Sequence, residues 1–333
     1  MFRFRIIIIC ILISVWGCRK DKPASESGKN LIVLERFDRD LPRFVSDTTD
    51  NPAKFIKQYS DFLPLYCYGI LNLSPENSGD SLYTRSGLSE FLSNAAIKKL
   101  YDDAETEFSS INDIESGLSD AFSRYTGLFP GNPIPRILTH ISGLNQSIII
   151  SDSLISISLD QYLGASYPDY KSIFYPYQLA MKERSRIAPD VMQVLLYTQF
   201  PPTNNSRTLL DEIVYEGSIL YALQQIFPEK TIGQILGYQD KEINWCIENE
   251  SAIWDKIIRQ KHLFSTDLLL KSKYLGPAPF TAPVSPESPG RAGRWIGWRI
   301  VSEYMKRCDC PLQELLGHPD NGEEILKISK YKG

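Results

Sequence analysis

Apolar residues recur every three or four positions over several long stretches of this chain, which is typical of amphipathic helices. The pattern predicts helices over residues 52–63, 88–101, 111–122, 187–200, 207–226 and 242–260. In one of these stretches Pro189 falls in the first turn, and Asp190 stands where a carboxylate favours the helix dipole. The chain is therefore expected to be mainly helical.

Shorter β-rich runs, separated by turn residues, lie near the middle of the chain. They predict strands at residues 137–141, 147–151 and 154–159, which we expect to form a small antiparallel meander. An alternating apolar segment within residues 31–44 indicates a further first strand. The fold class that follows is α+β, predominantly α-helical, with a small antiparallel sheet.

A late stretch, residues 288–298, carries glycines at helical spacing. Ser288 is placed to cap a helix, and Pro289 suits its first position. Each interior glycine costs roughly 1 kcal/mol against alanine, so we expect the glycine face to let another backbone approach closely. The residues expected to pack or interact here are Gly290, Arg291, Gly293, Arg294, Trp295, Gly297 and Trp298.

The N-terminal segment is basic, then apolar, then small, and a cysteine follows. Arg3 and Arg5 precede an apolar run too short to span a bilayer comfortably, and Gly17 stands directly before Cys18. This order predicts a lipoprotein signal peptide at residues 1–17 and a covalent lipid on Cys18. The alternative is an uncleaved membrane anchor. Either arrangement tethers the remainder to a membrane outside the cytoplasm.

The rest of the chain divides into a spacer and one large body. Residues 18–30 are polar and predict a lipidated N-terminus with a flexible spacer, and residues 31–333 predict a single globular periplasmic domain. Loss of the signal segment removes two arginines, so the net charge of −4 becomes −6. This mild acidity argues against nucleic acid as a partner.

Cysteine and histidine are sparse. Cys308 and Cys310 are too close in sequence for an unstrained bridge, so we expect two partly exposed thiols near a helix end. The histidines, His140, His262 and His318, are far apart in sequence, and we expect His140 to be a hydrogen-bonded structural residue. No metal and no cofactor other than the lipid is predicted.

A second candidate for binding is the tyrosine-rich region at residues 162–177. Tyrosines at this density favour either an interface between elements or a binding groove, because each ring buries apolar area while its hydroxyl requires a partner.

Two acidic residues on one predicted helix, Glu212 and Glu216, flank an apolar stripe. Glu216 precedes Gly217, which would allow close packing beside a carboxylate.

The order of several segments resembles the gliding-motility lipoprotein GldB family of Bacteroidetes-type bacteria. The matching segments are the lipoprotein start and residues 159–164, 187–192, 215–217, 245–250, 288–304 and 329–331. The resemblance covers nearly the whole body. It implies a cell-envelope lipoprotein required for gliding, which works with the envelope machinery for motility and protein secretion.

That family is in turn similar to predicted zinc peptidases of the zincin type, whose ligands this chain lacks. The resemblance puts Pro189 at the first histidine, Asp190 at the general base and Gln193 at the second histidine. Glu216 would stand at the third ligand. Proline has no side-chain donor and glutamine is a poor zinc ligand, so hydrolytic zinc chemistry is not expected. Instead, we expect Glu216 to pair with Arg291 or Arg294.

The sequence thus predicts a non-enzymatic envelope lipoprotein with a degenerate zincin-like domain, on the periplasmic face of the outer membrane. Its partners would be the membrane, through the lipid, and other motility or secretion proteins. One alternative is a divergent hydrolase that uses Asp190 and Glu216 as paired carboxylates. The other is a periplasmic binding lipoprotein with a groove at residues 162–177.

Overall fold

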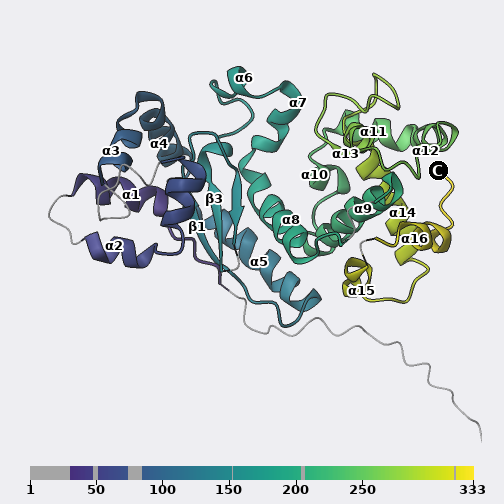
Figure 1. Ribbon diagram of the computed structural model, residues 1–333, viewed down its shortest axis with the longest axis horizontal. Coiled ribbons are helices and arrows are strands. Elements are labelled where there is room, and N and C mark those ends of the chain that lie inside the picture. The colour runs from purple at the N-terminus through teal and green to yellow at the C-terminus, as the bar shows by residue number, and fades with distance from the viewer. Residues whose placement is uncertain (1–30, 48–51, 74–84, 152, 204–206, 319) are drawn as a thin grey trace, which may run out of the picture.

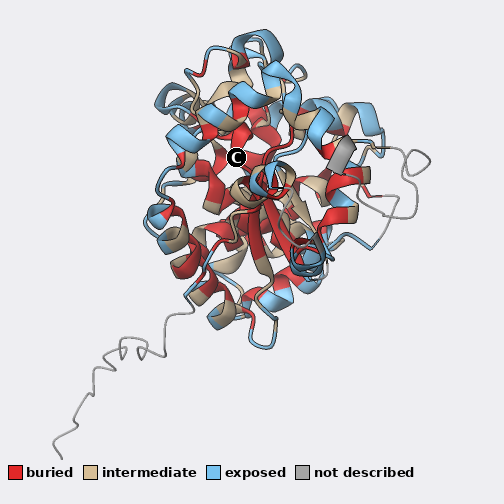
Figure 2. Cartoon of the chain, turned by 90° about the vertical axis from the view of Figure 1, so that its left-hand side faces the viewer, coloured by how far each residue is buried: buried red, intermediate tan, exposed pale blue. Residues whose placement is uncertain are grey.

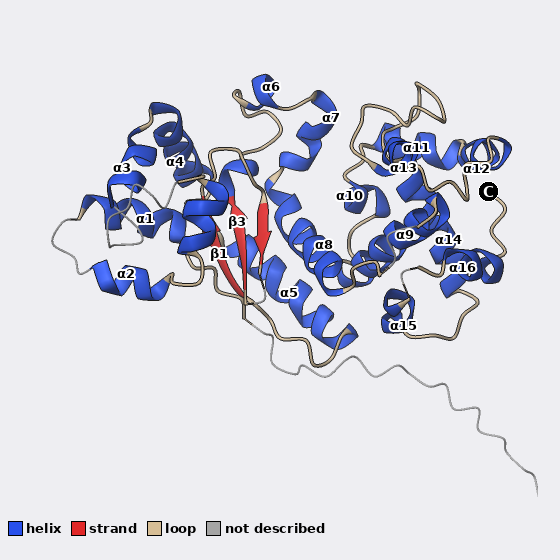
Figure 3. Cartoon of the chain, viewed as in Figure 1, coloured by secondary structure: helices blue, strands red, loops and turns tan. Residues whose placement is uncertain are grey.

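The computed structural model describes residues 31–47, 52–73, 85–151, 153–203, 207–318 and 320–333. The predicted signal peptide, Cys18 and the spacer lie outside these residues. The helices are α1 Phe37–Ser46, α2 Pro52–Gln58, α3 Arg85–Ser93, α4 Ala95–Glu107, α5 Asn112–Leu128, α6 Tyr170–Ile173, α7 Pro176–Leu179, α8 Ile187–Gln199, α9 Leu209–Ile226, α10 Ile232–Leu236, α11 Asp240–Glu248, α12 Glu250–Arg259, α13 Leu268–Leu275, α14 Ala292–Met305, α15 Leu312–Gly317 and α16 Gly322–Ser329. A π-helical segment spans Leu65–Ile70, and 3₁₀ turns span Leu159–Gln161, Ala180–Lys182 and Arg184–Arg186. The strands are β1 Arg136–His140, β2 Ile148–Ile150 and β3 Leu154–Ser158 (Figures 1 and 3).

The three strands form one sheet in the order β1-β3-β2, with β3 in the centre. The positions of the strands were predicted correctly, but the prediction that they form an antiparallel meander was wrong. β2 pairs antiparallel to β3, whereas β1 pairs parallel to it, with Arg136 opposite Leu154. The sheet is therefore mixed. Alternation identifies a strand from its own residues, whereas its direction relative to a neighbour depends on the path of the connection.

A buried carboxylate holds that connection in place. Asp160, just beyond β3, accepts the backbone N–H of Ser142 at 3.1 Å and that of Leu144 at 2.6 Å. Both donors follow β1, so the chain leaving β1 is fixed beside the end of β3, as a parallel pair requires. Burial raises the pKa of Asp160, although these backbone donors and the Ser158 hydroxyl oppose the rise. The fold class, α+β and predominantly helical, agrees with the prediction.

The sheet separates two apolar clusters. Leu138 and Leu154 face the smaller cluster, built by α1, α2, the π-helical segment and α3. Ile155 and Ile157 face the larger cluster, which continues through α5, α8 and α9 into the C-terminal helices. In Figure 2 the buried residues run through the middle of the molecule, with exposed residues around the periphery. The alternation along β3 thus sends successive side chains into different cores.

Several predicted boundaries were wrong. Residues 31–44 form no strand beyond a single bridge between Glu35 and Leu138, and α1 begins at Phe37. The apolar spacing of Phe37, Leu41 and Phe44, all buried, is helical rather than alternating. The stretches 88–101 and 242–260 are each divided between two helices, and the second division falls at Asn249. The helix predicted at residues 52–63 ends at Gln58.

The C-terminal half is organised around α9, whose residues are largely buried. The most extensive interface between two helices in this half is that of α9 with α14. The helices α10, α13, α15 and α16 also contact α9 (Figure 1). None of the helices within the described residues is long and apolar enough to cross a membrane.

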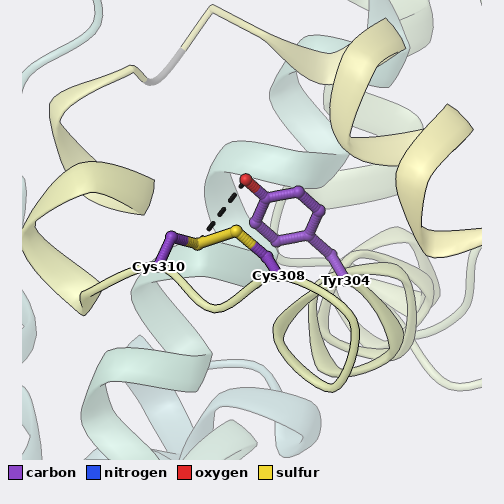
Figure 4. The surroundings of a disulfide bond; sticks show 3 residues. All are labelled: Tyr304, Cys308 and Cys310. Atoms are coloured by element: carbon purple, nitrogen blue, oxygen red, sulfur yellow. Dashed lines mark hydrogen bonds between the residues drawn. A yellow bond between two sulfur atoms is a disulfide. The ribbon is translucent and has the colours of Figure 1, made fainter.

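Cys308 and Cys310 are joined by a disulfide immediately after α14, so the prediction of two free thiols was wrong (Figure 4). Their Cα atoms are 5.2 Å apart, within the range that a disulfide spans. The chain turn after the helix supplies this approach. The hydroxyl of Tyr304 lies 3.7 Å from Cys310 Sγ. Cys67 and Cys246 are free and buried.

Candidate functional site

The contact between α9 and α14 depends on two glycines that face each other. A Cβ atom built at Gly217 would lie 2.1 Å from the carbonyl carbon of Gly297. A Cβ atom at Gly297 would lie 1.8 Å from the carbonyl oxygen of Ile213. Real Cβ atoms essentially never approach other atoms so closely, so only glycine fits at either position. The predicted close approach of another backbone to the glycine face is confirmed.

The other glycines of residues 288–298 face different neighbours. A Cβ at Gly290 would meet the Ala278 carbonyl oxygen at 1.9 Å, and one at Gly293 the Tyr274 carbonyl oxygen at 2.9 Å. The helix itself begins at Ala292, so the predicted start with Ser288 as cap and Pro289 as first residue was wrong. Instead, the Ala292 N–H donates to the hydroxyl of Thr281, which lies in the proline-rich loop between α13 and α14.

The predicted ion pair of Glu216 is present, and its partner is Arg294. Arg294 Nε lies 2.9 Å from Glu216 Oε2, and the two side chains are 8% and 19% exposed. The Tyr197 hydroxyl donates to the same Glu216 oxygen at 2.6 Å. Burial opposes the charge on Arg294, but Tyr197 and Glu216 nevertheless hold its pKa above the ordinary value. This cluster ties α8, α9 and α14 together.

Asp190 forms a second charged pair, one turn into α8. Arg186 Nη2 lies 2.6 Å from Asp190 Oδ1, and the Tyr162 hydroxyl donates to the other oxygen at 3.2 Å. Arg186 also donates to the backbone carbonyls of Gln234 and Ile235, just before the end of α10. Burial raises the pKa of Asp190, and Arg186 opposes that rise.

These contacts define what the two carboxylates can do chemically. Glu216 and Asp190 each have their own arginine and their own tyrosine hydroxyl. A carboxylate used for acid–base chemistry needs access to the reacting proton. In this arrangement both Oδ atoms of Asp190, and the Oε2 atom of Glu216, are contacted by arginine and tyrosine side chains of neighbouring elements. Both groups are therefore well suited to joining elements.

The two tryptophans of α14 are also held in place. Trp295 is buried, and its ring centroid lies 5.1 Å from that of Trp298. The Trp298 indole N–H donates to the side chain of Gln224 on α9 at 3.0 Å. Arg299 lies 5.9 Å from both ring centroids and pairs with Glu250 at 2.8 Å. Of the residues predicted to pack here, Gly297 and Trp298 therefore contact α9, and Gly293 contacts α13.

Across the described ranges, no three His, Cys, Asp or Glu side chains gather in a way that could hold a metal ion. His140 is buried in β1 with Nδ1 2.6 Å from the Ser156 hydroxyl, which agrees with the predicted structural role. His262 Nδ1 lies 3.0 Å from the Tyr274 hydroxyl. These contacts place the two histidines in separate parts of the fold.

The tyrosine-rich region is mostly packed. Tyr162, Tyr167 and Tyr170 are buried, and their hydroxyls donate to Asp190, Asp103 and the Asp160 carbonyl, respectively. Among the tyrosines of this region, the exposed one lies near its end. Tyr175 is exposed, and its ring stacks on that of Tyr177 at 5.7 Å.

Sequence reasoning missed some of the partners. Arg186 precedes Asp190 by four residues, and this spacing on a helix is a signal that could have identified the pair. Tyr197 carried no such signal, because it reaches Glu216 from another helix. Glu212, beside the apolar stripe of α9, contacts Arg207 at 3.2 Å and Lys271 at 3.3 Å, and neither partner was predicted.

The fold and these contacts define a helical α+β protein whose charged pairs join helices around two packed glycines. Within this class, the chain belongs to the family described as gliding motility protein GldB, whose sequence profile matches residues 18–333. The chain is thus a gliding-motility lipoprotein of the cell envelope. No curated protein and no solved structure matches it. The zincin similarity therefore stays a prediction.

Proposed function

We propose that this protein acts without catalysis, as a lipid-anchored scaffold that binds other proteins of the gliding and secretion apparatus. The observation that carries the proposal is the pairing of Asp190 and Glu216, each with its own arginine. The alternative hydrolase needs at least one of these carboxylates to act on a substrate. Their contacts instead favour a role in joining helices. Anchoring through a lipid on Cys18, at the periplasmic face of the outer membrane, is part of the same proposal.

An exposed apolar surface supports binding to a protein. Phe264, Leu268 and Leu269, which we call the apolar tip, lie within six residues of one another at the start of α13. Their exposed fractions are 57%, 73% and 66%. Lys261, three residues before this stretch, and Lys273, four residues after it, are also exposed, as is Asp267 within it. Exposed apolar groups with a polar rim are typical of protein contacts. The proposed occupant is an apolar surface with an acidic border on another envelope protein.

Complementation separates the scaffold from the hydrolase. In the source bacterium with its own gene deleted, we would measure single-cell gliding with Leu269→Asp, Asp190→Asn or Cys18→Ala in place of the wild-type chain. Ile173→Asp is the matched control for the first variant, because Ile173 is also exposed, at 53%, but lies on α6. The scaffold predicts loss of gliding with Leu269→Asp and Cys18→Ala only.

The opposite result would overturn the proposal. If Asp190→Asn abolished gliding at wild-type abundance and melting temperature while Leu269→Asp did not, the hydrolase would be favoured. A metal assay on chain 18–333, purified without chelators, gives an independent check. Near-stoichiometric zinc would contradict the expectation of no metal.

A further inference from the structure

A cavity of about 160 Å³ lies where α7 and the following 3₁₀ turn approach α10 and the segment before α14. Part of its wall is apolar or aromatic, supplied by Tyr177, Met181 and Tyr238. Its charged lining residues are Lys182, Arg291 and Glu242. The cavity is separate from the apolar tip. It thus combines a small apolar wall with two cations and one anion.

Lys182 is a partly buried ammonium group without a carboxylate partner. Its Nζ donates to the Gln161 side-chain oxygen and lies 4.0 Å from the centroid of the Phe174 ring. Of the carboxylates in the described residues, none lies within 4.0 Å of this nitrogen. Burial lowers the pKa of Lys182, with Asp190 and Asp160 opposing at longer range. An anion in the cavity would offset this desolvation.

Arg291 is the second cation, and its backbone holds it in place. Its φ of 62° is left-handed, which directs the chain sharply into α14. The guanidinium donates to the Leu236 carbonyl at 3.1 Å and lies 5.8 Å from the centroid of the Tyr238 ring. Its other N–H donors have no carboxylate within 4.0 Å anywhere in the part of the chain described. Burial lowers its pKa, and so does the nearby charge of Arg294.

The other charges near the cavity cancel only part of the charge of Lys182 and Arg291, because Glu242 is the one carboxylate among the lining residues. Arg186 and Arg294 lie behind it, each paired with a carboxylate. Glu242 accepts the backbone N–H of Gln239 at 2.7 Å, where it helps to cap α11. Lys182 and Arg291 thus leave a net positive charge on a partly buried wall. Such a charge is costly unless an anion compensates for it.

We propose that this cavity binds the oxyanion of a small organic molecule, a carboxylate or phosphate attached to an aromatic or apolar body. Arg291 offers the planar fork that matches either oxyanion in a bidentate manner, and Lys182 offers a point charge. Tyr177, Met181 and Tyr238 would contact the body of the ligand. The inference goes beyond the proposed scaffold, because partner binding through the apolar tip does not require it.

The test is calorimetric titration of chain 18–333, which contains every described residue. The probes are phenyl phosphate, benzoate and inorganic phosphate, with benzamide as the neutral control. We expect saturable one-to-one binding of an anionic aromatic probe and none of benzamide. Tighter binding of phenyl phosphate than of benzoate would indicate a phosphate site, and the reverse order would indicate a carboxylate site. Tight binding of inorganic phosphate would identify the free ion as a source.

The variants locate the binding. Lys182→Gln is expected to weaken it at least about tenfold, because a hydrogen-bonded charge is lost. Arg291→Lys keeps the charge but loses the fork, and should also weaken binding. Lys171→Gln on α6 is the matched control, because Lys171 is exposed and the change in net charge is the same. Circular dichroism and melting temperature show that each variant is folded.

Two results would overturn the inference. One is the absence of saturable binding of all three anions to the wild-type chain at about millimolar concentration, the weak end of specific affinities. The other is equal weakening by Lys182→Gln and Lys171→Gln, which would indicate a general charge effect. If Arg291→Lys fails to fold, Lys182→Gln and its control still decide the question.

Discussion

Replacing Gly297 with alanine tests whether the approach of α9 to α14 decides the stability of the C-terminal half. The new Cβ would lie 1.8 Å from the Ile213 carbonyl oxygen. Restoring an ordinary contact of 3.4 Å requires the helices to move apart by roughly 1.6 Å. The opposing atom is backbone and cannot rotate away. The side chains packed between the helices would then lose contacts along the whole interface.

The expected magnitude follows from two opposing effects. Overpacking a core costs about 1–3 kcal/mol, and a clash with backbone belongs at or above the upper end of that range. Alanine is favoured over glycine inside a helix by about 1 kcal/mol, which offsets part of the loss. We therefore expect the free energy of unfolding to fall by at least about 2 kcal/mol. With a urea slope of about 3 kcal/mol/M, the midpoint would fall by roughly 0.7 M.

The assay is urea unfolding of chain 18–333, followed by circular dichroism. Gly117→Ala is the matched control, because Gly117 lies inside α5 and the nearest atom to its added Cβ is 3.9 Å away. That variant should be neutral or slightly more stable than wild type. If Gly297→Ala proved as stable as Gly117→Ala, the reasoning about helix approach would be refuted.

Three further predictions concern the Glu216–Arg294 pair, His140 and the disulfide. Glu216→Gln and Arg294→Met should each lower the free energy of unfolding by about 3 kcal/mol, and the double variant should lose less than the sum; additive losses would show that the ion pair is not coupled. Burial lowers the pKa of His140 to about 3 from an ordinary 6.5. The neutral form therefore contributes its full stability above pH 6.5, and that stability is lost as the pH falls towards 3, by up to about 1.4 kcal/mol per pH unit. Urea unfolding at several pH values should show that the free energy of unfolding of His140→Gln depends less steeply on pH than that of the wild-type chain. An unchanged dependence would contradict this. The disulfide closes a very short loop, so the double variant Cys308→Ser with Cys310→Ser should lower the free energy of unfolding by no more than about 1.5–2 kcal/mol. Mass spectrometry of the wild-type chain should detect the bridge before reduction.

Local patterns identified most elements because they depend on neighbours in the sequence. The helical spacing of α8 and α9 and the alternation of the three strands belong to single segments. Boundaries were less well predicted where one segment supports two patterns. The segment that contains α1 was interpreted as a strand, because the apolar residues 31–33 directly before the helix suggested one. The start of α14 was placed three residues early, because Thr281, whose hydroxyl accepts the Ala292 N–H, lies in a distant loop.

The glycines of residues 288–298 determined, from sequence alone, that another backbone would approach this helix, since their cost requires such a contact. Sequence also limited the partners of Glu216 to two arginines. Only the tertiary structure selected Arg294, because the choice depends on how α14 is rotated against α9. The parallel pairing of β1 with β3 and the cavity between Lys182 and Arg291 were likewise decided by chain path. Residues far apart in sequence form these features, and no local pattern records their approach.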